Sequence, residues 1–311
     1  MVALLFPGQG SQSVGMGRDL ADAFPEARAV FEEADDALGA GLSRIMWQGP
    51  EDELTATLNA QPAILVHSIA VLRIAGDLAG SAAFAAGHSL GEFSAHVAAG
   101  TVSFADAVRL VRRRGEAMHA AGQERPGTMA AVIGLEDDAV RAVCAEVSAR
   151  AGVVVAANFN APGQVVISGE VGAVEQARAA AQEAGARRAL PLNVSGAFHS
   201  PLMAPAAESL ERALADVEFR TPAFPVVSNV TAEPVRDARA AKALLVDQLT
   251  NPVRWVDGMR TLRGLGVGRF VEVGPGNVLT GLLRRIDRAA EGVAIGTAED
   301  VGRALAAAAS A

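Results

Sequence analysis

The sequence has 311 residues, which is enough for one large hydrophobic core and a smaller additional one. Half of the residues are hydrophobic and a fifth are charged, the ordinary balance of a globular protein. The formal net charge of −8 argues against a surface that binds nucleic acid, so we expect no nucleic-acid partner.

The single cysteine limits the covalent and metal chemistry that the chain can carry. One cysteine forms neither an intrachain disulfide nor a cysteine-based metal site, and we expect Cys144 to be a small buried hydrophobic residue. Residues 1–7 lack a basic region, and their apolar run is too short for a signal peptide. No apolar run reaches the ~18 residues of a membrane helix. We therefore expect a cytoplasmic protein without membrane contacts. We also expect a monomer.

The first predicted element is a buried strand over residues 2–6, closed by a glycine-rich turn over residues 7–12. This turn has neither a G-x-G-x-x-G pattern nor a Lys-Ser/Thr ending, so it is a weak candidate for a nucleotide loop. A loop at the carboxyl end of a strand is still where open α/β sheets place their sites. Gln9 can offer its side-chain amide or its backbone N–H there. Helices follow, predicted at 18–38, 42–47 and 63–72.

The third of these helices is apolar on nearly all faces and should be buried, with His67 as a hydrogen-bonded core histidine. It leads to a short apolar strand that ends in Gly87-His88-Ser89-Leu90-Gly91, a G-x-S-x-G pattern followed by a helical run. This order is typical of a nucleophile elbow, in which a sharp turn exposes the serine hydroxyl and the helix N-terminus faces a developing oxyanion. The alternative is an ordinary Gly-Ser turn.

Four arginines lie on the next predicted helix, over residues 105–120 and capped by Ser103 or Thr101. Three of them share one side at spacings of three and four and should be solvated: Arg109, Arg112 and Arg113. Arg114 points elsewhere. A lone arginine that faces the interior is costly unless it meets an anion.

Beyond a predicted linker at 122–127, the pattern changes to strand–helix–strand–strand–helix–strand. The six elements are predicted at 129–133, 137–151, 153–158, 164–168, 173–184 and 188–194. This is the ferredoxin-like order. We interpret residues 127–195 as a ferredoxin-like subdomain inserted into a larger α/β domain made of residues 1–126 and 196–311.

The rest of the chain returns to the larger domain. Its predicted elements are helices at 203–215, 242–249 and 278–288, strands at 224–227 and 269–273, and an alanine-rich tail from residue 301. The loop at 195–201 lies between a strand and a helix and contains His199. No internal repeat is present.

A serine nucleophile needs a base, and the chain has five histidines. Four lie in predicted helices or in the elbow itself: His67, His88, His96 and His119. Only His199 lies in a loop after a strand, where its imidazole can face Ser89 for acyl transfer. The alternative is a histidine that caps a helix or a turn. Asp247 and Glu272 are candidates for a third catalytic residue, but a backbone carbonyl can orient the imidazole equally well.

Several motifs in a fixed order resemble those of the malonyl-CoA:acyl carrier protein transacylases, a family that includes polyketide-synthase acyltransferase domains. The resemblance spans essentially the whole chain. The motifs are Phe6-Pro7-Gly8-Gln9-Gly10-Ser11-Gln12, Gln61-Pro62-Ala63, Gly87-His88-Ser89-Leu90-Gly91-Glu92, Leu110-Val111-x-x-Arg114-Gly115, Asn158-Phe159-Asn160, Ala197-Phe198-His199, Gln248 before Asn251-Pro252-Val253, and Glu272-Val273-Gly274-Pro275-Gly276.

The resemblance implies a reaction and a set of residue roles. Ser89 would be the nucleophile and His199 the base of a ping-pong transfer through malonyl-Ser89. Malonyl-CoA would be the donor and holo acyl carrier protein the acceptor, with no cofactor and no metal. The remaining implied roles are an oxyanion hole from the N–H groups of Gln9 and Leu90, a malonyl carboxylate clamp at Arg114, a base-orienting carbonyl at or next to Gln248, and site-lining positions at His88, Gln61 and Asn158.

The resemblance also implies a fold, an α/β-hydrolase-like domain with a parallel sheet and a ferredoxin-like insert, and a site in the cleft between them. Phe198 stands in an Ala-Phe-His run that accompanies malonyl preference in polyketide acyltransferases. Alternatives are a serine acyl hydrolase, a discrete acyltransferase that serves a polyketide synthase, and a non-catalytic module that binds carrier protein. A buried Arg114 would argue against a general esterase. The carrier could dock on a local basic patch, for which Arg187, Arg188, Arg284 and Arg285 are candidates.

Overall fold

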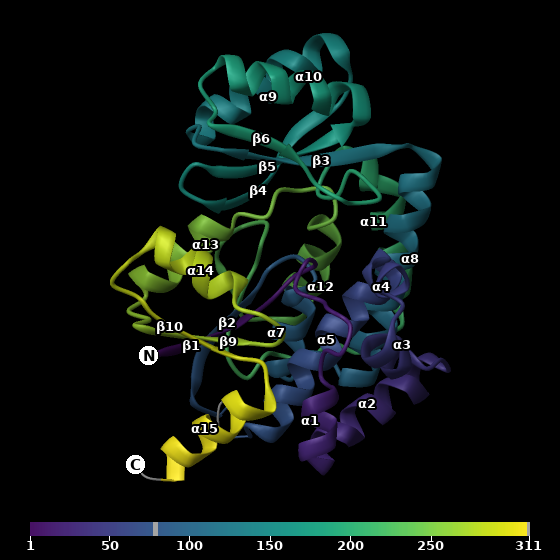
Figure 1. Cartoon of the computed structure of the whole chain (residues 1–311), viewed down its shortest axis with the longest axis vertical. Coiled ribbons are helices and arrows are strands. Elements are labelled where there is room, and N and C mark those ends of the chain that lie inside the picture. The colour runs from purple at the N-terminus through teal and green to yellow at the C-terminus, as the bar shows by residue number, and fades with distance from the viewer. Residues whose placement is uncertain (77–79, 310–311) are drawn as a thin grey trace.

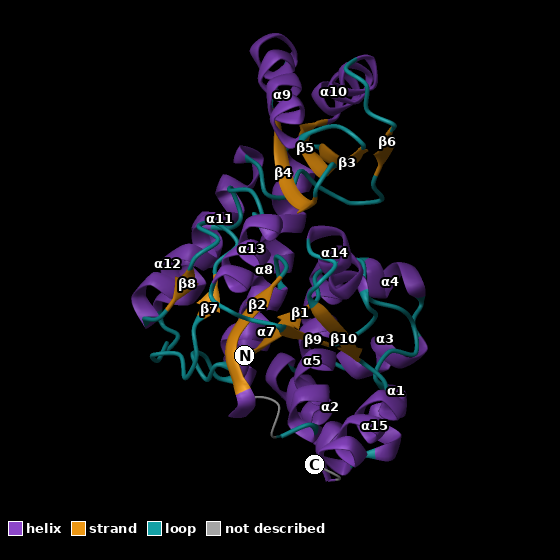
Figure 2. Cartoon of the chain, turned by 90° about the vertical axis from the view of Figure 1, so that its left-hand side faces the viewer, coloured by secondary structure: helices purple, strands orange, loops and turns teal. Residues whose placement is uncertain are grey.

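A six-stranded sheet crosses the middle of the molecule in the computed structural model, which describes residues 1–76 and 80–309 (Figures 1 and 2). All neighbouring strands pair in parallel except the last two, β7 and β8. The sheet order is β10 (Glu291–Ile295), β9 (Arg269–Val273), β1 (Val2–Phe6), β2 (Ala82–Gly87), β7 (Val226–Val227) and β8 (Pro234–Val235). The central strand β1 is a continuous apolar run because both of its faces are buried.

Helices cover both faces of this sheet and bury alternate residues of β1. Leu4 and Phe6 belong to the larger core, which packs under α2, α5, α7, α8 and α11. Ala3 and Leu5 belong to a second core with Trp255 and Met259, under α13 and α14. The helices are α1 (Arg18–Ala23), α2 (Pro25–Leu38), α3 (Leu42–Gln48), α4 (Glu51–Thr55), α5 (Thr57–Ile74), α7 (Gly91–Ala98), α8 (Phe104–Glu124), the 3-10 turn η1 (Pro201–Met203), α11 (Ala204–Ala215), α12 (Ala238–Asp247), α13 (Trp255–Gly264), α14 (Val278–Ile286) and α15 (Ala298–Ala309).

A second sheet stands above the first (Figure 1) and is built from one stretch of chain. Its elements are β3 (Gly127–Ile133), α9 (Asp137–Ala151), β4 (Val154–Ala161), β5 (Gln164–Glu170), α10 (Val171–Glu183) and β6 (Arg188–Pro191). The strands pair antiparallel in the order β4-β5-β3-β6, which is the ferredoxin-like arrangement. The predicted fold class is therefore confirmed, whereas the exact domain boundaries stay a prediction.

The insert carries its own core and is tied to the larger unit through β4. Both of its helices pack on one face of its sheet, where Cys144 is buried as predicted. On the side of the larger unit, the N–H of Phe159 donates to the Val253 carbonyl at 2.9 Å, and the N–H of Val253 donates to the Ala157 carbonyl at 2.8 Å. These two bonds bring β4 beside the segment that precedes α13. Among the described residues, no helix is both long and apolar enough to cross a bilayer.

Several predicted elements differ from the structure at proline residues. The predicted helix at 18–38 is two helices, because Phe24 precedes Pro25 and adopts an extended conformation with φ −130° and ψ 116°. The helix predicted from residue 63 begins at Thr57 and contains Pro62 in its interior.

His67, in the same helix, has a hydrogen-bond partner for only one of its two ring nitrogens. Its Nε2 bonds the Gly296 carbonyl at 2.7 Å, while its Nδ1 has no partner among the described residues.

Other differences concern short or unexpected elements. The linker predicted at 122–127 is wrong, because α8 continues to Glu124 and β3 begins at Gly127. Ser103 is the residue that caps α8, with its Oγ accepting from the Asp106 N–H at 3.1 Å. Four elements of the structure were not predicted from the sequence: α4, α13, β8 and β10.

The turn between β2 and α7 brings backbone segments into direct contact. A Cβ atom at Gly87 would collide with the Gly91 carbonyl group, and one at Gly91 would collide with the Phe6 carbonyl oxygen. Ser89, between these glycines, has a left-handed backbone with φ 51°. The predicted elbow geometry is present because both flanking positions lack side chains.

We expect Gly87→Ala to lower the free energy of unfolding by at least about 3 kcal/mol, because the added methyl group meets backbone atoms that cannot rotate away. Gly172→Ala in α10 is the matched control, since a Cβ there meets nothing within 4 Å. The control should change stability by less than about 1 kcal/mol, and toward greater stability. Denaturant unfolding of the two variants measures the difference, and equal effects would contradict this account of the elbow.

Candidate active site

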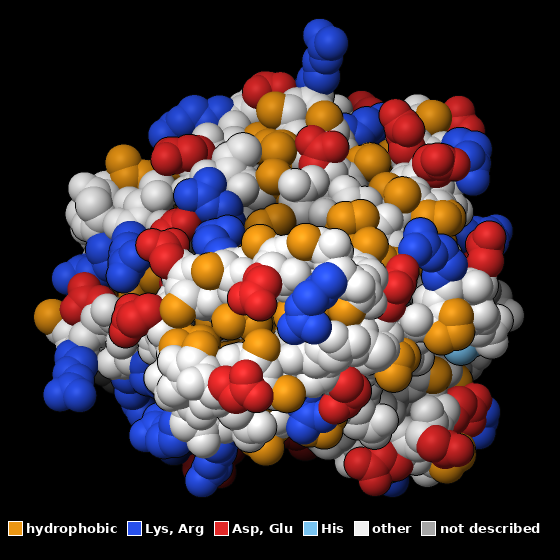
Figure 3. All heavy atoms as spheres, turned by 90° about the horizontal axis from the view of Figure 1, so that it is seen from above, with side chains coloured by type: hydrophobic (Ala, Val, Ile, Leu, Met, Phe, Trp, Pro, Cys, Tyr) orange, Lys and Arg blue, Asp and Glu red, His pale blue; other side chains and the backbone are white. Residues whose placement is uncertain are grey.

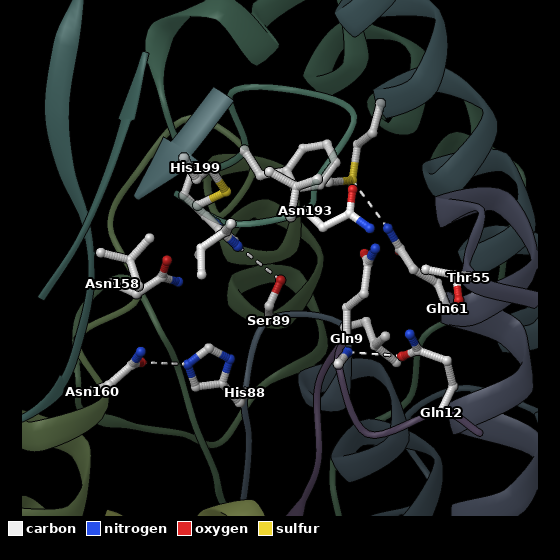
Figure 4. A pocket seen from close by; sticks show the side chains of 18 of the residues that line it. Gln9, Gln12, Thr55, Gln61, His88, Ser89, Asn158, Asn160, Asn193 and His199 are labelled. Carbon is white, nitrogen blue, oxygen red and sulfur yellow. Dashed lines mark hydrogen bonds between the residues drawn. The ribbon is translucent and has the colours of Figure 1, made fainter. Parts of the chain in front are cut away.

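Ser89 and His199 meet in a cavity between the two sheets, although 110 positions separate them in the sequence (Figure 4). Ser89 Oγ lies 2.8 Å from His199 Nε2. The other ring nitrogen, Nδ1, lies 2.9 Å from the Gln248 carbonyl oxygen. A carbonyl only accepts, so Nδ1 carries the hydrogen and Nε2 presents its lone pair to the serine hydroxyl.

The backbone at His199 is itself unusual. Its φ of 57° lies in the left-handed region, where few residues other than glycine are found. The next residue fixes the turn, because Ser200 Oγ donates to the Ala197 carbonyl at 2.6 Å and accepts from the Leu202 N–H at 3.3 Å. This turn aims the imidazole at the elbow.

Neither acid that the sequence suggested as a third catalytic residue contacts His199. Asp247 is exposed at the end of α12, where its carbonyl oxygen accepts from Asn251 Nδ2 at 2.8 Å. Glu272 is buried and accepts from the N–H groups of Leu279 and Thr280, at 2.9 and 2.8 Å. It therefore caps the first turn of α14. Both candidates are wrong, and the group that contacts His199 Nδ1 is instead the carbonyl of Gln248.

Burial keeps the imidazole of His199 neutral. Desolvation and the positive charge of Arg114 together lower its pKa to about 3, against the opposing effect of the Gln248 carbonyl. The lone pair on Nε2 is therefore free at neutral pH. A proton that His199 accepts from Ser89 is held only transiently and is readily passed on to a leaving group.

Arg114 is a buried cation that lines this cavity, and it is only 1% exposed. Its Nη1 donates to Gln61 Oε1 at 2.5 Å, and its Nη2 donates to Ser89 Oγ at 3.1 Å and to Gln248 Oε1 at 2.9 Å. Burial lowers its pKa to about 10, so the guanidinium stays charged at neutral pH. None of the ion pairs between described residues includes Arg114. A buried cation without a carboxylate partner is suited to an anionic ligand.

The other arginines of α8 follow the prediction in part. Arg109 and Arg113 are exposed, as expected for a solvated face. Arg112 is half-buried, and its Nη1 donates to Asn59 Oδ1 at 2.6 Å. The expectation for Arg112 is wrong because α5 packs against this side of α8 and supplies the acceptor.

Two further residues hold the elbow, and neither has a role that the sequence predicted. Asn229 follows β7 and spans the turn, since its Oδ1 accepts from the Ser89 N–H and its Nδ2 donates to the Gly87 carbonyl, both at 2.7 Å. Glu92 lies in the first turn of α7 and accepts from the Asn229 N–H at 3.1 Å. The only signal for Asn229 in the sequence was its position at the end of a predicted strand.

The groups that the resemblance assigns to an oxyanion hole border the same cavity. Leu90 precedes α7, and Gln9 follows β1. Within the described part of the chain, the backbone N–H groups of both residues have no protein acceptor. The Ser89 N–H is not available to an oxyanion, because it donates to Asn229 Oδ1. The side chain of Gln9 is directed to Thr57, with Nε2 donating to Oγ1 at 3.3 Å.

The cavity has a volume of about 320 Å³ and is lined by the loops that follow β1 and β2, by α5 and α8, and by strands β3, β4 and β5 of the insert. The remaining site residues from the sequence border it: Gln61, His88, Asn158 and Phe198. His88 is turned aside from Ser89, with its Nε2 2.8 Å from Asn160 Oδ1 (Figure 4). Asn158 and Asn160 belong to β4, so the insert supplies one wall of the cavity.

The chain is similar to known proteins over almost its whole length. The family model described as "Acyl transferase domain" matches residues 3–303. The chain is 45% identical over 304 residues to the malonyl CoA-acyl carrier protein transacylase of Bacillus subtilis, covering 98% of this chain and 96% of the relative. It is 49% identical over 285 residues to the protein of the same name from Escherichia coli K12, covering 91% and 92%.

Two solved structures are similar over almost the whole chain. One is an acyl-carrier-protein-S-malonyltransferase from Bartonella henselae, with a TM-score of 0.94, 46% identity and 98% of each chain covered. The other is a malonyl-transacylase in complex with its type II PKS acyl-carrier protein, with a TM-score of 0.94, 46% identity, and 98% and 99% coverage.

Proposed function

This chain belongs to the acyl transferase family and, within it, to the malonyl CoA-acyl carrier protein transacylases, and from this premise we propose that it moves malonyl groups from malonyl-CoA to the phosphopantetheine thiol of holo acyl carrier protein. The carrier as acceptor is supported by the related malonyl-transacylase in complex with an acyl-carrier protein. A cytoplasmic location and a monomeric state remain predictions.

In the first half-reaction, His199 Nε2 takes the proton of Ser89 Oγ, and the oxygen attacks the thioester carbonyl of malonyl-CoA. The N–H groups of Gln9 and Leu90 stabilise the tetrahedral oxyanion. When the intermediate collapses, the C–S bond breaks, and the CoA sulfur leaves with the proton from His199. The products are malonyl-Ser89 and CoA.

The second half-reaction transfers the malonyl group from Ser89 to the carrier by the same kinds of step. His199 accepts the proton of the pantetheine thiol, the sulfur attacks the ester carbonyl, and Ser89 leaves with that proton. The carrier is then malonylated and the enzyme is regenerated, which is a ping-pong mechanism. The 2.8 Å contact between Ser89 and His199 and the Gln248 carbonyl behind the imidazole support this assignment.

The observation that carries the malonyl assignment is the buried guanidinium beside the nucleophile. Arg114 Nη2 lies 3.1 Å from Ser89 Oγ, so an acyl group on that oxygen extends within reach of a cation. Malonyl has a carboxylate that acetyl lacks, and a guanidinium can bind it with two parallel charge-assisted hydrogen bonds. A general esterase has no use for this cation.

Exposed arginines on the insert and on α14 are candidates for the carrier-docking surface. Arg187, Arg188, Arg284 and Arg285 are all exposed, and Arg285 contacts Gln164 of the insert. Seen from the side of the insert, cationic and anionic side chains are interspersed rather than segregated (Figure 3). These four arginines remain candidates for contact with an acidic carrier.

Incubation with radiolabelled malonyl-CoA tests the proposed function directly. We expect stable label on Ser89, which holo acyl carrier protein removes and water does not. Ser89→Ala should abolish labelling, and His199→Ala should slow it about 10²- to 10⁴-fold, because general-base catalysis is lost. Label on Ser89→Ala would refute the nucleophile, and release of free malonate without carrier would identify a hydrolase instead.

The specificity rests on Arg114 in this account. Arg114→Ala should lower kcat/KM for malonyl-CoA about 10²- to 10³-fold, while kcat/KM for acetyl-CoA holds or rises, because an unpaired buried cation penalises neutral acyl groups. Arg114→Lys should restore only part of the malonyl activity, since a point charge lacks the planar fork. Arg113→Ala removes an exposed arginine of the same helix and should change neither value. An equal loss for both thioesters in Arg114→Ala would make this residue structural.

A further inference from the structure

Glu92 is a buried carboxylate directly behind the nucleophile elbow, only 1% exposed. Its Oε2 accepts from Gln248 Nε2 at 2.7 Å and from the Asn229 N–H at 3.1 Å. Its Oε1 has no hydrogen-bond partner among the described residues. The mechanism above uses neither oxygen. A buried carboxylate with one free oxygen therefore needs a physical explanation.

The Gln248 side chain links this carboxylate to Arg114. Its Oε1 accepts from Arg114 Nη2 at 2.9 Å, while its Nε2 donates to Glu92 Oε2. One amide thus lies between a buried cation and a buried anion, with its oxygen toward the positive group and its N–H toward the negative one. The same Nε2 lies 3.0 Å from the Ser89 carbonyl oxygen. The two charges are joined in one network without touching.

We propose that Glu92 is the internal counter-anion of Arg114 and that it becomes neutral, by taking up a proton on its free Oε1, when a substrate carboxylate binds Arg114. This role makes Glu92 a positioning residue that tunes acyl-group specificity, and it rests on the proposed malonyl transfer. Oε2 continues to accept from Gln248 and Asn229 in both states, so the elbow is held throughout. The proton comes from solvent, and no bond to substrate is involved.

The electrostatics of the free enzyme favour such an exchange. Desolvation raises the pKa of Glu92 to about 7, against the opposing effects of the Asn229 N–H, the Gln248 amide and the charge of Arg114. A malonyl carboxylate on Arg114 cancels that positive charge and adds a negative one nearby. Both changes disfavour the Glu92 anion, so binding raises its pKa further.

Few other titratable groups face Glu92. Strands β1, β2 and β7, which pack against α7, contain none. Helix α5 carries His67, which bonds Gly296, and Arg73, which is exposed. Arg114 is the cation from α8. Burial lowers the pKa values of the histidines near the network and so favours their neutral forms: His88, His96 and His199.

Malonyl binding should depend on pH, because it is coupled to the protonation of Glu92. Because the pKa of Glu92 is higher in the malonyl complex than in the free enzyme, malonyl binding is strongest below pH 7 and weakens as pH rises above it. The measured quantity is the ratio of kcat/KM for malonyl-CoA to that for acetyl-CoA, between pH 6 and 9. Ionisations of the CoA phosphates and of His199 affect both thioesters and cancel in this ratio.

In the wild type, the ratio should fall with rising pH, by at most about tenfold per pH unit, which is the limit for one proton. Glu92→Gln keeps an acceptor oxygen for Gln248 and Asn229 but cannot ionise. Its ratio should be independent of pH and should exceed the wild-type ratio at pH 9, by about tenfold for each unit by which malonyl raises the pKa. A pH-independent wild-type ratio, or a wild-type slope in Glu92→Gln, would overturn the proposal.

Glu272→Gln is the matched control, because Glu272 is also fully buried and also has a pKa raised by desolvation. It caps α14 and lies outside the residues that line the cavity, so this variant should keep the wild-type slope. A loss of slope in both variants would assign the effect to general destabilisation. Absence of malonyl transfer in the wild type would instead refute the proposed function.

Calorimetry provides a second measurement that does not depend on the folding of Glu92→Gln. Ser89→Ala binds thioesters without turnover, and titration at pH 7.5 in two buffers of different ionisation enthalpy gives the protons taken up. Binding of malonyl-CoA should be accompanied by the uptake of a fraction of one proton more than binding of acetyl-CoA, which carries the same phosphates. Equal uptake by the two thioesters would contradict proton transfer to Glu92.

Discussion

The constraint on which the site depends is the burial of the Arg114 guanidinium beside Ser89. Moving a charge out of water costs several kcal/mol unless hydrogen bonds and an opposite charge compensate. Here the compensation comes from the neutral amides of Gln61 and Gln248, which bond Arg114 directly. Glu92 contributes indirectly, through its hydrogen bond with Gln248. The guanidinium is therefore held in place by neutral groups, and it can still bind an anion directly. Selectivity for an acidic acyl group follows from that imbalance.

Gln248 connects this electrostatic feature to the catalytic pair. Its side chain binds Arg114 and Glu92, whereas its carbonyl sets the tautomer of His199. Specificity and base orientation thus depend on one residue at the end of α12. Both reacting side chains also have left-handed backbones, held by Asn229 at the elbow and by Ser200 after the imidazole. Local strain of this kind persists only where surrounding contacts enforce it.

The elements that could be predicted from the sequence carry local signals. The elbow has a glycine on each side of a serine, and the insert alternates strand and helix periods clearly enough to give its topology. His199 could be found because it alone among the histidines lies in a loop. The family resemblance then supplied Arg114 and Gln248, to which spacing alone assigns no role.

The parts that the sequence did not reveal depend on long-range contacts. Asn229 acts on Ser89 across 140 positions and follows a strand of only two residues, which leaves almost no local pattern. Glu92 resembles an ordinary first-turn acid, since only its burial distinguishes it. Helices at proline were misjudged in both directions, because packing decides whether Pro25 begins a helix or Pro62 is tolerated within one.

The central claim is that Arg114 receives the carboxylate of the acyl group on Ser89. A crystal structure of the malonyl-Ser89 enzyme, trapped in His199→Ala, tests it most directly. The account predicts the malonyl carboxylate within hydrogen-bond distance of the Arg114 guanidinium, with Gln248 still bridging Arg114 and Glu92. A malonyl group whose carboxylate faces solvent, with the bonds from Arg114 to Gln61 and Gln248 unchanged, would contradict it.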